Sequence, residues 1–130
     1  MPLTKETKQK IFEQLKSVMQ KNAKPMVIAS ASNTGILIIG NIPVPYGSKK
    51  VMIPGMHFSS ASICKDSIAF HFFPTYMNEK EFKPLAPETY KTLKGKTCFH
   101  FKKETDVNEK EIQELFKKGI AFYKKMGWIK

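Results

Sequence analysis

Apolar residues recur at helical spacing near both ends of the chain, with polar and charged residues on the opposite side. We expect a first helix over residues 4–21, with Thr4 as its N-cap, and a second that begins after Asn108. Glu111 lies three residues beyond Asn108, a spacing that favours a capping box, and Gly127 suits the helix end. The apolar residues at helical spacing are Ile11, Phe12, Leu15, Val18 and Met19 in the first helix, and Ile112, Leu115, Phe116, Ile120, Tyr123 and Met126 in the second.

The chain between these helices carries short β-branched runs and alternating apolar and polar residues, which are typical of strands. Residues 56–63 and 67–73, joined by a tight turn at Asp66, predict a hairpin. In its first strand, Phe58 and Ser60 are expected on one face, and Ser59 and Ala61 on the other. Further strands are expected at 26–30, 36–39, 50–53 and 97–102, a short helix at 87–93, and an irregular segment or short helix at 74–83.

This order of elements predicts an α+β fold, a two-layer sandwich whose N- and C-terminal helices pack on one face of an antiparallel sheet. The chain has 130 residues, 42% of them hydrophobic, so we expect a single domain over residues 1–130. No apolar run approaches bilayer length and residues 1–10 lack an apolar signal region, which favours a cytoplasmic protein with no membrane partner. Two cysteines, Cys64 and Cys98, are too few for a disulfide scaffold and are expected to be reduced.

The net charge of +11 comes from 22 basic residues, every one of which is lysine. Arginine, which supplies the planar fork used to recognise phosphate and guanine, is absent from the sequence. We favour a solvated, lysine-rich surface without a specific partner. The alternative is a basic interaction module for an anionic partner such as nucleic acid, whose binding would depend strongly on salt.

All three histidines lie in predicted strands, and each is followed by a phenylalanine. If the phenylalanines face the helices, then His57, His71 and His100 emerge on the opposite face of the sheet, together with Cys98. Imidazole and thiolate are common ligands of zinc and other late transition metals. These four residues therefore predict a transition-metal or small-ligand site. The alternative is three unrelated histidines hydrogen-bonded to nearby hydroxyl or carbonyl groups, because their spacing matches no known ligand motif.

Patterns that indicate catalysis are missing from the sequence. The serines near His57 lack a nucleophile-elbow glycine pattern, and no group of glycines forms a phosphate-binding loop. The carboxylates of residues 104–114 suit a helix N-terminus, or alternatively a loose site for hard cations. The proline-containing segment 42–56 is either a functional loop or a plain crossover at the sheet edge. A non-enzymatic binding protein is favoured, with its natural ligand and oligomeric state left open; the alternative is an enzyme with a His/Ser site in a closed pocket around His57.

Three motifs in the second half of the chain resemble the YdhG-like family of uncharacterised small bacterial proteins. They are LKGKTCFHF at residues 93–101, GIAFYK at residues 119–124 and the closing pair Gly127-Trp128. The resemblance implies a compact domain with terminal helices packed on an antiparallel sheet, similar in architecture to frataxin. Since some members are assigned an iron-chaperone role, it also implies metal handling, of iron or zinc. No acidic residue of frataxin-type iron sites can be matched here, so no site residue is carried over.

Overall fold

The computed structural model describes residues 4–24, 26–46, 49–65, 67–94 and 98–130. The turn expected at Asp66 and the start of the strand expected at Thr97 lie outside these residues. The helices, including two short 3-10 segments, are α1 (Lys5–Lys21), α2 (Phe73–Phe82), η1 (Lys83–Leu85), α3 (Pro87–Tyr90), η2 (Glu104–Asp106) and α4 (Glu109–Met126). The strands are β1 (Val27–Ala31), β2 (Gly35–Ile39), β3 (Val44–Tyr46), β4 (Val51–Ile53), β5 (His57–Ile63), β6 (Ile68–Phe72), β7 (Leu93–Lys94) and β8 (Cys98–Phe101).

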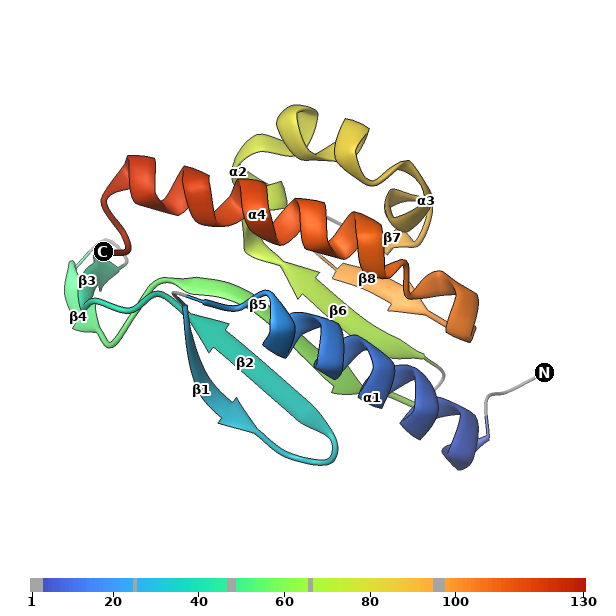
Figure 1. Cartoon of the computed structure of the whole chain (residues 1–130). Helices are drawn as coiled ribbons and strands as arrows, with labels where there is room; N and C mark the ends of the chain where they lie inside the picture. Colours follow the sequence, from blue (N-terminus) through green and yellow to red (C-terminus); the bar gives the residue numbers. More distant parts are fainter. Residues whose placement is uncertain (1–3, 25, 47–48, 66, 95–97) are drawn as a thin grey trace.

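Six of the strands form one sheet in the order β1-β2-β5-β6-β8-β7, and each neighbouring pair is antiparallel. In Figure 1, α1 and α4 lie across the same face of this sheet, and α2 and α3 lie beside α4. The predicted α+β sandwich with terminal helices on one face is confirmed. The opposite face of the sheet carries no helix among the described residues, so we call it the open face.

Aromatic side chains fill the layer between the helices and the sheet. The ring of Phe58 packs edge-on against Phe72, Phe116 and Tyr123, with centroids 5.5, 5.0 and 5.2 Å away. Such ring pairs contribute about 0.5–1.5 kcal/mol each beyond the area they bury. Gly119 of α4 lies against this cluster, and its missing side chain lets the helix approach the sheet closely.

The ends of the two long helices follow the sequence closely. Thr4 accepts a hydrogen bond from the Thr7 amide at 3.1 Å. Asn108 accepts one from the Glu111 amide at 3.1 Å, so both predicted N-caps are confirmed. Gly127 ends α4 in the left-handed conformation, with φ of 78°.

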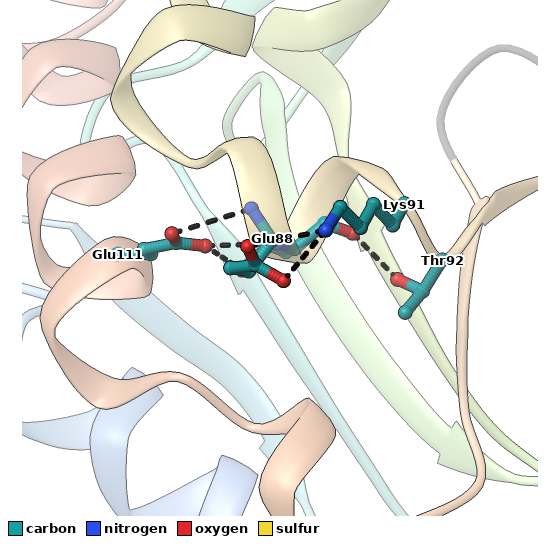
Figure 2. A network of polar contacts seen from close by, with 5 residues as sticks. Glu88, Lys91, Thr92 and Glu111 are labelled. Atoms are coloured by element: carbon teal, nitrogen blue, oxygen red, sulfur yellow. Dashed lines mark hydrogen bonds and ion pairs between the residues drawn. The ribbon is translucent and has the colours of Figure 1, made fainter.

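The Glu111 carboxylate does not complete the expected capping box; it reaches the first turn of α3 instead. Its oxygens accept hydrogen bonds from the Thr89 amide at 2.8 Å, the Thr89 hydroxyl at 2.7 Å and the Glu88 amide at 3.3 Å. Figure 2 shows this carboxylate beside Glu88, whose own side chain pairs with Lys91. Glu111 thus supplies the acceptor that α3 lacks on its own cap residue, and joins two helices.

Strand β5 has one more residue than its partner β2 along their pairing. This bulge changes which face of the sheet its side chains occupy. Ile38 of β2 lies opposite Ser59, but Ile39 lies opposite His57, so Phe58 has no partner of its own. Beyond this bulge Ser59 and Ala61 are buried on the core side. The expectation that Ser60 shares a face with Phe58 is therefore wrong, because a bulge resets the two-residue period of a strand.

Two proline-containing segments form regular structure. Residues 74–83, expected to be irregular or a short helix, contain most of α2, with Pro74 near its start. Part of the loop expected at 42–56 forms a separate hairpin in which β3 pairs with β4. Tyr46, Val51 and Met52 of this hairpin are exposed.

Candidate thiol and imidazole site

Strand β8 places one thiol and one imidazole on the open face. Because Phe99 and Phe101 are fully buried under the helices, Cys98 and His100 must point the other way, as predicted. The two side chains meet there, with Cys98 Sγ 3.3 Å from His100 Nε2. On the far side of the ring, His100 Nδ1 lies 2.9 Å from the hydroxyl of Ser67, a buried residue. Sulfur, imidazole and hydroxyl thus form a continuous chain of polar contacts.

His71 lies next to this chain on strand β6. It faces Cys98 directly in the antiparallel register, while Ala69 faces His100. The partial burial of His71, and then the charge of His100, lower the pKa of its imidazole. This shift favours the neutral form of His71, in which a ring nitrogen can bind a metal ion.

The Cys98 thiol is less acidic than an ordinary cysteine. Partial burial, and then the nearby thiol of Cys64, raise the pKa of Cys98. A nucleophilic cysteine needs the opposite shift, because the thiolate is the reactive form. The contact with His100 therefore does not make Cys98 an activated nucleophile.

Among the described residues, His57 does not join this chain of polar contacts, although His71 stacks on the same Phe73 ring with centroids 6.3 Å apart. The His57 ring stacks on Tyr46 at 6.4 Å, with an angle of 11° between the planes, and packs edge-on against Phe73 at 5.5 Å. Its carbonyl accepts a hydrogen bond from the Tyr123 hydroxyl. His57 thus links β5 to the β3–β4 hairpin and to α4.

Of the four residues predicted to bind a metal, the structure brings Cys98 and His100 into contact and places His71 opposite Cys98 on the neighbouring strand. Within the described part of the chain, no three His, Cys, Asp or Glu side chains are already arranged to hold a metal ion. The metal site stays a prediction, and binding would require side-chain rotation on the open face.

Sequence reasoning missed Ser67 and the nearby Cys64. Ser67 follows a turn, and nothing in its local sequence indicates a partner 33 residues away. The signal lies in the strand register: since Ala69 faces His100, Ser67, two residues before Ala69, lies diagonally from His100 on the same face of the sheet. Finding this contact requires the order β6-β8, which alternation within single strands does not provide.

Two of the acidic residues near the start of α4 have structural partners. Asp106 accepts hydrogen bonds from the Lys102 and Lys103 amides at 2.9 and 3.1 Å. Glu111 accepts the α3 amides described above. Asp106 and Glu111 thus bind backbone amides at the start of η2 and of α3 rather than of α4, and the predicted cation site stays a prediction.

Comparison with known proteins found no matching family model and no significant similarity to a curated protein or a solved structure. The resemblance to the YdhG-like family stays a prediction. In the described residues, no helix combines the length and the apolar character needed to cross a membrane. Function is therefore inferred from the side chains themselves.

Proposed function

We propose that this protein is a non-enzymatic binding protein that holds a late transition metal ion, of the zinc class, on the open face of its sheet. Cys98 and His100 are the first two ligands and His71 is the third. The observation that carries the proposal is the 3.3 Å separation of Cys98 Sγ and His100 Nε2. Sulfur and nitrogen bound to one tetrahedral zinc ion lie about 3.5 Å apart, given zinc bond lengths of about 2.3 and 2.0 Å.

The Ser67 hydroxyl supports this assignment. Histidines that bind metals usually hold the other ring nitrogen in a hydrogen bond, which fixes the tautomer and the ring orientation. In the proposed site Nδ1 of His100 donates to Ser67, and the lone pair of Nε2 faces Cys98. This arrangement orients His100 before any metal arrives.

A soft donor set favours zinc over hard cations such as calcium and magnesium. Thiolate and imidazole suit zinc, whereas calcium and magnesium prefer oxygen donors. With three protein ligands, the fourth position of the metal is left to water or to a partner's ligand. That open position suits metal transfer, the role that the YdhG-like resemblance implies.

Calorimetric titration of reduced, metal-free protein with Zn²⁺ tests the proposal. We expect one ion per chain, with affinity at least tenfold lower in Cys98→Ser and in His100→Ala. His57→Ala is the matched control, because it removes an imidazole outside the proposed ligand set and should leave the affinity unchanged. No binding, or equal losses in all three variants, would exclude this site.

A further inference from the structure

A groove on the helical side of the molecule, away from the open face, concentrates positive charge. It has a volume of about 460 Å³ and lies between the C-terminal end of α1 and α4. Lys21 and Lys24 line one side, and Lys117 and Lys124 line the other. All four lysines are exposed, and no carboxylate lines the groove.

These charges are poorly neutralised by the protein. Lys21 has one ion pair, with Glu109 at 3.8 Å, and both side chains are more than half exposed, so the pair contributes little. Within the described residues, Lys24, Lys117 and Lys124 form no ion pair. A concave surface with several charges of one sign raises the local concentration of oppositely charged ligands.

The groove also offers an apolar floor. Ile120 and Ala121 lie between Lys117 and Lys124 along α4, and both line the groove. Lys124 follows Lys117 by seven positions, which is a rise of about 10.5 Å along the helix axis. A ligand that combines several negative charges with an uncharged part therefore fits better than a simple inorganic anion.

The end of α1 does not oppose such a ligand strongly. The last carbonyls of a helix carry partial negative charge. Here the Asn22 side-chain amide donates to the Val18 carbonyl at 2.8 Å, and the Asn22 backbone amide bonds the Val18 and Met19 carbonyls. These bonds satisfy two of the last carbonyls of α1.

We propose that this groove binds nucleoside phosphates, either free nucleotides or the nucleotides of a single strand. The phosphates lie between the lysines of α1 and α4, and the sugar or base lies against Ile120 and Ala121. Lysine serves as a phosphate ligand through its charge, without the fixed geometry of arginine. Such a site recognises phosphate spacing rather than base sequence, as in other sequence-tolerant contacts.

Fluorescence anisotropy with a labelled 12-nucleotide oligothymidylate, and with a labelled ATP analogue, tests the proposal in the presence of EDTA. The groove variant is Lys117→Gln/Lys124→Gln. The matched control is Lys118→Gln/Lys125→Gln, which removes the same charge at the same spacing from the other side of Ala121, where Lys118 already pairs with Glu81 at 3.0 Å. Thermal unfolding of both variants establishes that they fold.

We expect the groove variant to bind at least one probe tenfold or more weakly, and the control less than threefold more weakly. Binding of ATP alone assigns the groove to free nucleotides, and a much tighter, salt-dependent complex with the oligonucleotide assigns it to a strand. Equal losses in the two variants would mean non-specific attraction and would overturn the proposal. So would failure to bind either probe. Because EDTA removes metal ions, none of these outcomes depends on the thiol and imidazole site.

Discussion

Cys98 Sγ and His100 Nε2 lie 3.3 Å apart, although the two residues are separated by one position on a single strand. Residues at this spacing have their backbones about 6.6 Å apart, so the two side chains lean toward each other. Ser67 contacts His100 on the other side of the ring. Strand β8 thus supplies both members of the pair, and Ser67, in the turn just before β6, contacts the imidazole from the neighbouring strand's side.

Replacing Ser67 with alanine should weaken Zn²⁺ binding. The variant removes the hydroxyl that orients His100, and loss of such an outer partner typically lowers metal affinity about 10- to 100-fold. Ser59→Ala is the control, because Ser59 is also buried and donates to the His71 carbonyl at 2.7 Å, but it does not touch His100. Calorimetry should show the loss in Ser67→Ala only. Equal affinities in both variants would show that Ser67 has no positioning role.

Glu111→Gln should destabilise the fold by about 1–3 kcal/mol, the cost of weakening several charge-assisted bonds to partly buried groups. The carboxylate holds the first turn of α3 against α4 through Thr89 and Glu88. Urea unfolding measures the change, with Glu114→Gln as the control because Glu114 is exposed on the same helix. If the two variants are equally stable, the contact of the Glu111 carboxylate with α3 contributes nothing to the stability of the fold.

Gly119→Ala should lower the free energy of unfolding by about 1–3 kcal/mol, although alanine is the better helix former. The added Cβ would lie 2.8 Å from Phe58 Cε1 and 3.0 Å from Phe72 Cζ, both in fully buried rings. Gly127→Ala is a useful comparison, since nothing lies within 4 Å of its Cβ and only the positive φ opposes it. Its cost should be about 1 kcal/mol. Thermal unfolding of both variants tests this ranking, which a more stable Gly119→Ala would contradict.

Stability should fall in alkaline solution, above about pH 10. Burial raises the pKa of Tyr90 to about 12, despite its hydrogen bond with Thr75, and burial also raises the pKa of Tyr123. The ordinary tyrosine pKa is about 10, so the unfolded chain loses these protons first. The stabilisation is complete below pH 10 and is lost as the pH rises through the folded-state pKa. Urea unfolding at pH 8 to 11.5 measures the free energy of unfolding. This free energy should decline less steeply with pH in Tyr90→Phe and Tyr123→Phe than in the unchanged protein. If the free energy of unfolding declines equally in all three proteins, the loss of stability at high pH comes from groups other than these tyrosines.

The sequence predicts the features of this fold that depend on neighbours along the chain. Thr4, Asn108 and Gly127 mark helix ends through local hydrogen bonds and backbone geometry, and each is confirmed. The open-face position of Cys98 and His100 follows from alternation with Phe99 and Phe101. These signals are contained within a few residues.

Features that depend on distant neighbours could not be predicted in the same way. The bulge at Phe58 is set by the register between β2 and β5, and the Glu111 carboxylate is drawn to an α3 turn 22 residues away. The partner of His100 is likewise fixed by the pairing of β6 with β8. His57 lies with Tyr46 and Phe73 because the β3–β4 hairpin packs there. Tertiary packing decides each of these contacts.

The most direct test of the proposed metal site is a cobalt(II) titration followed by absorption spectroscopy. Cobalt(II) takes the same ligands as zinc and gives sulfur-to-cobalt charge-transfer absorption only when a thiolate is bound. We predict this absorption at one ion per chain, its disappearance in Cys98→Ser, and its retention in Cys64→Ser and His57→Ala. A spectrum without charge transfer, or one that survives in Cys98→Ser, would contradict a metal site built on Cys98 and His100.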